Sequence, residues 1–162
     1  MPAATSFSPS SVSNNVLVVG YGNVTRQDDG AGVHVAERIR NLSLPRVTVW
    51  TCHQLNLELL EDMDPFSTII LIDAGQQEET VVLRQINIPT HGGRLSSSHH
   101  MSPEFLARMA LTLYHRVPRL FVCSIQAEQF ALNESIRPQL EPKLRQAEEL
   151  VLNLIQKEQH HA

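Results

Sequence analysis

The sequence has few cysteines, and their placement excludes two classes of small protein. Only two of the 162 residues are cysteines, and Cys52 and Cys123 lie in separate apolar stretches. This arrangement matches neither a disulfide framework nor the paired spacing of a zinc site. We therefore expect two reduced, buried thiols, as is usual for a cytoplasmic protein.

The sequence also lacks an excess of basic residues and any long hydrophobic run. Lysine and arginine total 13 against 17 aspartates and glutamates, for a net charge of −4. Nucleic acids and anionic membranes attract proteins through clustered positive charge, which is absent. The longest apolar runs, such as residues 69–72, are far shorter than the ~20 residues that span a bilayer. No secretory signal is recognisable near residue 1. We expect a cytoplasmic protein with neither a nucleic-acid nor a membrane partner.

The sequence does contain alternating strand and helix patterns, over a length that fits one domain. Residues 1–14 are rich in Ser, Pro and Ala and predict a disordered arm before a single domain at 15–162. Ser102 and Pro103 predict the start of a helix, and Pro89 favours an edge position for the strand before it. We expect strands at 16–19, 47–51, 68–72, 80–88 and 120–125, and helices at 29–40, 55–63, from 102 and at 138–156.

This alternation predicts a three-layer α/β/α fold with a mostly parallel sheet of about five strands. Ligands of such sheets bind beyond the carboxyl ends of the strands. Three segments are expected there: the loop at 20–32, Asp73 to Gly75 after the central strand, and residues 96–100 before a helix.

The first of these loops is rich in glycine but is not a dinucleotide site. Thr25 stands where such a site needs a third glycine, and no acid ends the second strand. Asp28 and Asp29 would repel a phosphate at the helix start. A nucleotide-dependent enzyme is thus a weak alternative, and a cation is the better ligand.

Acidic and histidine side chains at the three segments suggest a metal site. Asp28 and Asp29 could equally cap a helix, Asp73 could be a turn residue, and the histidine of residues 96–100 could lie on the surface. Taken together, two carboxylates and an imidazole suit nickel, zinc or manganese. GxSxG and HExxH are absent, which argues against a serine hydrolase or an ordinary zinc protease. Cys52 beside His53 leaves a thiolate nucleophile as a minor option.

Four motifs in order resemble those of the hydrogenase maturation endopeptidases, which remove a C-terminal peptide from the precursor of the nickel-iron hydrogenase large subunit. The motifs are Gly20-Tyr21-Gly22-Asn23, Asp28-Asp29-Gly30 with Gly32-Val33, Leu71-Ile72-Asp73-Ala74-Gly75, and Ser98-His99-His100-Met101-Ser102. The likeness runs from Val16 to the last helix. The segment Ser124-Ile125-Gln126-Ala127 departs from the Gly-Ile-Gln-Pro typical of the family.

The resemblance implies a site that senses metal and takes part in catalysis, formed by Asp29, Asp73 and His99. Asp28 is an alternative to Asp29, because this family often has Glu at the first-loop position, and His100 is an alternative to His99. The supporting residues implied by the motifs are Gly20, Gly22, Asn23, Asp28, Gly30 and Gly75.

The resemblance also implies a substrate and a partner. The nickel is carried by the hydrogenase large-subunit precursor, so it is the recognition signal and not a permanent cofactor. The metal could polarise the scissile carbonyl or activate a water, with Asp29 or Asp73 as general base. Alternatively, it could only position the tail while water is activated elsewhere. We expect a monomeric peptidase; the alternative is a nickel-sensing chaperone that binds the same precursor without cutting it.

Overall fold

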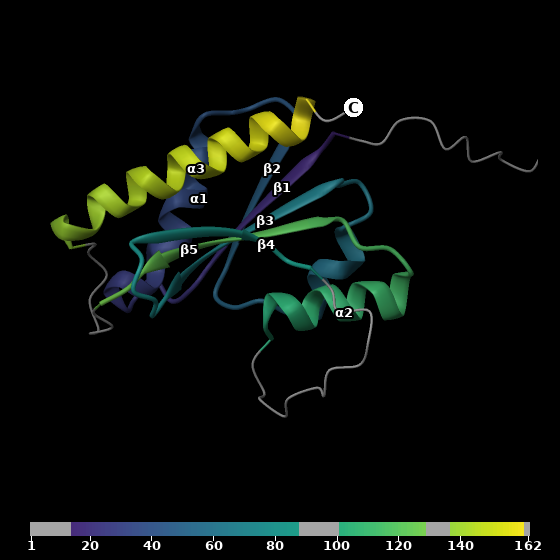
Figure 1. The fold of residues 1–162 in the computed structure, drawn as a ribbon, viewed down its shortest axis with the longest axis horizontal. Coiled ribbons are helices and arrows are strands. Elements are labelled where there is room, and N and C mark those ends of the chain that lie inside the picture. Colours follow the sequence, from purple (N-terminus) through teal and green to yellow (C-terminus); the bar gives the residue numbers. More distant parts are fainter. Residues whose placement is uncertain (1–13, 88–100, 129–136, 161–162) are drawn as a thin grey trace, which may run out of the picture.

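The computed structural model describes residues 14–87, 101–128 and 137–160 (Figure 1). Its strands are β1 (Val16–Tyr21), β2 (Val47–Cys52), β3 (Thr68–Gly75), β4 (Val81–Gln85) and β5 (Arg119–Gln126). Its α-helices are α1 (Ala31–Asn41), α2 (Pro103–Tyr114) and α3 (Glu141–His160), and three 3₁₀ helices are η1 (Gln27–Gly30), η2 (Leu57–Asp62) and η3 (Pro138–Leu140). Of the predicted arm at residues 1–14, all but Asn14 lie outside the described residues.

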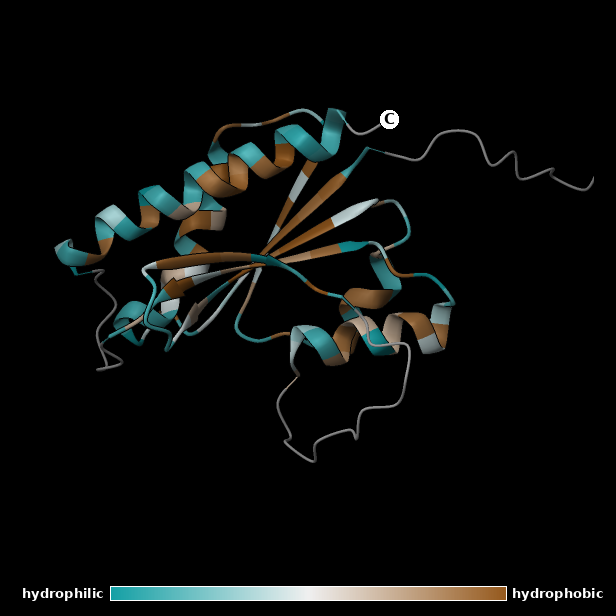
Figure 2. Ribbon diagram, in the orientation of Figure 1, coloured by the Kyte–Doolittle hydropathy of each residue, from teal (hydrophilic) through white to brown (hydrophobic). Residues whose placement is uncertain are grey.

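The predicted three-layer architecture is confirmed. The strands form one sheet in the order β2-β1-β3-β5-β4, with β3 at its centre. Helices α1 and α3 cover one face, and α2 and η2 cover the other (Figure 1). Figure 2 shows the apolar strands lying between these layers. Each face of the sheet therefore has its own buried core, as expected for strands that are apolar on both sides.

Pairing within the sheet is parallel except at one edge. β1 pairs in parallel with β2 and β3, and β3 pairs in parallel with β5. β4 runs antiparallel to β5 and forms the edge predicted from Pro89. After β3 the chain therefore reverses direction and skips one strand position, so that β4 lies on the far side of β5.

Close packing of α1 on the sheet depends on one glycine. A Cβ atom on Gly32 would lie 2.2 Å from the carbonyl oxygen of Ile72, a distance that no real side chain tolerates. The missing side chain lets the first turn of α1 lie directly on β3. This contact brings the loop after β1 beside the end of β3.

Two predicted elements differ in detail from those observed. The helix expected at 55–63 is the 3₁₀ helix η2, although the predicted apolar side chains Leu55, Leu59 and Leu60 are buried. β3 continues through Gly75, so Asp73 lies inside the strand and not after it. Within the described ranges, no helix combines the length and apolarity needed to cross a membrane.

Candidate active site

A cleft of about 360 Å³ lies at the carboxyl ends of β1, β2 and β3. It is lined by residues from the loop after β1, the segment after β2, the end of β3 and the start of the segment that leads into α2: Tyr21, Gly22, Asp29, His53, Gln54, Leu55, Asn56, Asp73, Ala74 and Met101. Two of the carboxylates predicted from the sequence, Asp29 and Asp73, therefore face one cavity although α1, β2 and η2 separate them in the chain. The third predicted side chain, His99, lies outside the described residues, as does His100.

Asp73 comes to this cleft from the face of the sheet that α2 covers. Residues alternate between the faces of a strand, so Asp73 follows Ile69 and Leu71, which both belong to the core under α2. The Tyr21 hydroxyl donates a hydrogen bond of 2.9 Å to Asp73 Oδ2. Asp73 Oδ1 is buried and has no hydrogen-bond partner among the described residues. A buried carboxylate oxygen left without a donor is costly unless a ligand supplies one.

Burial also changes the proton affinity of this carboxylate. Desolvation raises the pKa of Asp73 above its usual range, and the hydrogen bond from Tyr21 opposes part of that rise. The same environment raises the pKa of Tyr21, chiefly through burial and then through the nearby Asp73 charge. Tyr21 therefore remains a neutral hydrogen-bond donor near neutral pH.

Asp29 is held by the backbone of its own loop. The N–H of Asn23 donates to Asp29 Oδ2 at 2.9 Å. Gly22 has a φ of 145°, and a Cβ atom there would lie 2.0 Å from the carbonyl oxygen of Asp29. Only glycine permits this approach, so Gly22 and Asn23 together place the Asp29 carboxylate on the cleft wall.

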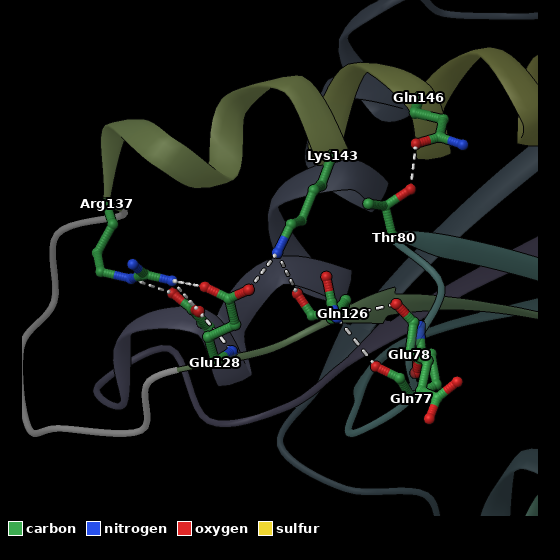
Figure 3. A network of polar contacts seen from close by, with 9 residues as sticks. Gln77, Glu78, Thr80, Gln126, Glu128, Arg137, Lys143 and Gln146 are labelled. Carbon is green, nitrogen blue, oxygen red and sulfur yellow. Dashed lines mark hydrogen bonds and ion pairs between the residues drawn. The ribbon is translucent and has the colours of Figure 1, made fainter.

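Asp28 has a different environment from its neighbour. Its side chain is completely buried, and it accepts hydrogen bonds from Arg137 Nε at 3.0 Å and Nη2 at 2.6 Å and from the N–H of Glu128 at 2.9 Å. Figure 3 shows Arg137, Glu128 and Lys143 in the polar network beside the start of α3. The geometry thus gives Asp28 a role in fixing the loop and leaves Asp29 as the carboxylate on the cleft.

The other predicted supporting residues pack closely around the site. A Cβ atom on Gly20 would lie 2.4 Å from the Gly32 carbonyl oxygen, and one on Gly75 would lie 2.4 Å from the Ser124 hydroxyl. Gly30 is buried beneath the backbone of Val24. These glycines allow neighbouring segments to approach each other.

Sequence reasoning missed two cleft residues, Tyr21 and His53. His53 follows the end of β2, the strand beside β1, and its exposed side chain lines the cleft with the two carboxylates. Its position at the carboxyl end of a strand was the available signal. In the described part of the chain, no three His, Cys, Asp or Glu side chains come close enough together to hold a metal ion.

The chemistry of the cleft suits a cation better than covalent catalysis by a thiolate. Two carboxylates in a partly buried cavity are the hard ligands that divalent ions prefer, and Asp73 Oδ1 has no hydrogen-bond partner among the described residues. Both cysteines are free, with Cys123 buried and Cys52 half-buried. Burial raises the pKa of Cys52, so its thiol is not activated beside His53.

Comparisons with known proteins bear on the fold. No family model matches the sequence, and no curated protein matches it either. Among solved structures, hydrogenase maturating endopeptidase HybD from E. coli superimposes with a TM-score of 0.71 at 22% identity, covering 88% of this chain and 93% of that one. The chain has the fold of the hydrogenase maturation endopeptidases.

Two archaeal structures with this endopeptidase fold support the assignment. NiFe hydrogenase maturation protease HycI from Thermococcus kodakarensis has a TM-score of 0.69 at 20% identity, covering 90% of this chain and 95% of that one. The hydrogenase 2 maturation peptidase from a Thaumarchaeota archaeon has a TM-score of 0.66 at 20% identity, covering 87% and 97%. The fold is thus matched over nearly the whole length of each structure.

Residues 124–127, the segment of the endopeptidase fold that departs from the family pattern, are held by side-chain amides. Gln126 Nε2 donates to the carbonyl oxygens of Gln77 and Glu78, each at 3.1 Å (Figure 3). Gln77 Nε2 donates to the Ser124 carbonyl at 3.0 Å. The end of β5 is therefore fastened to the turn after β3, next to Asp73.

Proposed function

We propose that this protein is an endopeptidase that removes the C-terminal peptide from the nickel-loaded precursor of a nickel-iron hydrogenase large subunit. The observation that carries the proposal is that Asp29 and Asp73 line one cleft at the carboxyl edge of the sheet. The fold shared with known maturation proteases supports the same assignment. His99 is the proposed third ligand, from the segment before α2.

In this proposal, nickel is part of the substrate. Two clustered carboxylates repel each other and are costly to keep dehydrated until a cation arrives. A nickel-loaded precursor would neutralise Asp29 and Asp73, whereas a nickel-free precursor would leave them unpaired. Discrimination between the two precursors then comes from the cost of the unpaired state.

The carboxylates also supply a candidate general base. Asp29 or Asp73 would take a proton from the water that attacks the scissile carbonyl carbon, and that proton then passes to the leaving amine. In one route the substrate nickel polarises the carbonyl; in the other it only positions the tail. Both routes require the two carboxylates to be ionised when they bind the nickel.

The decisive experiment is the intact mass of a large-subunit precursor after incubation with this protein, using nickel-loaded and nickel-free samples in parallel. Loss of a C-terminal peptide from the loaded sample alone is the expected result. Binding of the loaded precursor without any loss of mass would instead favour the nickel-sensing chaperone. Equal cleavage of both samples would contradict nickel recognition.

Variants separate the roles of neighbouring residues. Asp29→Asn and Asp73→Asn should abolish processing while far-UV circular dichroism stays unchanged, because both side chains lie on the cleft wall. Of His99→Ala and His100→Ala, only the first should abolish processing. If Asp28→Asn abolished processing without loss of stability and Asp29→Asn did not, the assignment of the two acids would be reversed.

A further inference from the structure

Tyr21 is a cleft residue to which neither the sequence motifs nor the proposed chemistry assigns a role. It ends β1, and the register that pairs Gly20 with Ile72 brings it beside Asp73 on the neighbouring strand. Its ring packs against the core under α2, and its hydroxyl donates to Asp73 Oδ2 at 2.9 Å. The tyrosine therefore joins a rigid apolar layer to a carboxylate at the cleft.

This hydrogen bond restricts the carboxylate that it reaches. An aspartate at the end of a strand can turn about its χ angles unless its oxygens are held. The Tyr21 hydroxyl holds Asp73 Oδ2, and Asp73 Oδ1 has no hydrogen-bond partner among the described residues. Asp29 differs, because a backbone N–H holds it and no side chain is needed.

We propose that Tyr21 is the positioning residue for Asp73, holding its carboxylate in the orientation that receives the metal of the substrate. The inference rests on the proposed function, in which Asp73 is a metal ligand. Carboxylates that bind metals are commonly oriented by hydrogen bonds from a surrounding donor, and loss of such a donor weakens metal binding about 10- to 100-fold. The role belongs to the hydroxyl group and not to the ring.

The test compares Tyr21→Phe with a matched control. The chain has two tyrosines, and Tyr114 is exposed on α2, so Tyr114→Phe makes the same chemical change away from the cleft. Ni²⁺ alone is titrated into the full chain by calorimetry, and Asp73→Asn gives the background from other side chains. Tyr21→Phe should weaken the Asp73-dependent binding about 10- to 100-fold, and Tyr114→Phe should leave it unchanged.

A double-mutant cycle separates positioning from general stabilisation. In the Asp73→Asn background, Tyr21→Phe should have no further effect on the affinity for nickel or on the Kd for loaded precursor. An equal loss with and without Asp73 would overturn the proposal, and so would a Tyr21→Phe chain that binds nickel like the wild type. If the wild-type chain processes precursor in that second case, only the Tyr21 inference fails. If the wild-type chain neither processes precursor nor binds nickel more tightly than Asp73→Asn does, the proposed function fails as well.

A second measurement covers the case in which Tyr21→Phe does not fold. Incorporating 3-fluorotyrosine into the Tyr114→Phe chain places a single fluorine label at Tyr21, with its hydroxyl retained. Paramagnetic Ni²⁺ should broaden this fluorine resonance, and Asp73→Asn should remove the broadening. A resonance unaffected by nickel that the chain demonstrably binds through Asp73 would overturn the proposal.

Discussion

Arg137 forms a bidentate ion pair with the fully buried Asp28, through Nε to Oδ1 at 3.0 Å and Nη2 to Oδ2 at 2.6 Å. The two residues are 109 positions apart, so the pair fastens the loop after β1 to the chain that leads into α3. Since Asp29 follows Asp28 directly, this ion pair also fixes one wall of the cleft.

Removing the guanidinium should therefore destabilise the whole domain. Arg137→Met leaves Asp28 buried without its cation, and loss of one partner of a buried pair costs about 3 kcal/mol or more in the free energy of unfolding. Arg145→Met on α3 is the control, because the Arg145 side chain is 74% exposed. Urea denaturation gives the unfolding midpoint of each variant. If Arg137→Met unfolded at the same urea concentration as Arg145→Met, the buried Asp28 would not need Arg137 for stability.

The buried carboxylate of Asp73 should reduce stability near neutral pH. Burial raises its pKa, so the folded chain binds this proton more tightly than the unfolded chain does. Stability then falls as pH rises from the unfolded pKa of about 4 through the folded value, and the full penalty applies above it. Asp73→Asn should raise the melting temperature at pH 7 and lose this advantage below about pH 4.

The control for that prediction is an aspartate with no buried environment. Asp62 is exposed on η2, so Asp62→Asn should leave the pH dependence of the melting temperature unchanged. A melting temperature for Asp73→Asn that is lower than the wild type's at pH 7 would mean that the ionised form is stabilised in the fold, contrary to the direction of its pKa shift.

The backbone of Gly22 should matter for activity more than for folding. Gly22→Ala places a Cβ atom against the Asp29 carbonyl and forces alanine to a φ of 145°. We expect a stability loss of about 1–3 kcal/mol and a fall in processing of about 100-fold, because Asp29 is displaced. Val24→Ala, an exposed change in the same loop, should process normally. A Gly22→Ala chain with wild-type processing would show that Asp29 need not lie where the structure has it.

The thiols should be dispensable for the chemistry. Cys52→Ser should retain full processing, because burial raises the pKa of the Cys52 thiol and leaves it protonated. Burial likewise raises the pKa of Cys123 to about 12. Iodoacetamide at pH 7 should therefore label both slowly in the folded chain and rapidly in urea. Abolished processing in a folded Cys52→Ser chain would instead point to a cysteine nucleophile.

The architecture was predictable because its signals are local. The β-branched runs at β1 and β3 and the Ser102-Pro103 helix start depend on residues close together in sequence, and Ser102 does accept a hydrogen bond from the Phe105 N–H. Parallel pairing follows from the alternation of strands and helices. By contrast, a 3₁₀ helix at η2 and an α-helix share the same short apolar pattern, so the sequence did not distinguish them.

The candidate site was only partly predictable because its contacts are long-range. An aspartate pair at a helix start looks the same in sequence whether it caps the helix or meets an arginine 109 positions away. Tyr21 beside a glycine is typical of a core aromatic, and its contact with Asp73 becomes visible only once β1 is known to lie next to β3. The missing information is thus the strand order and not the residue chemistry.

The position of the cleft follows from the way the chain winds through the sheet. After β1 the chain goes to α1 on one face, whereas after β2 it goes to η2 on the other. The diverging connections leave a crevice at the strand ends, whatever side chains line it. Replacing the carboxylates would therefore leave the crevice open, so an Asp29→Asn chain should keep the shape of the site while losing its charge.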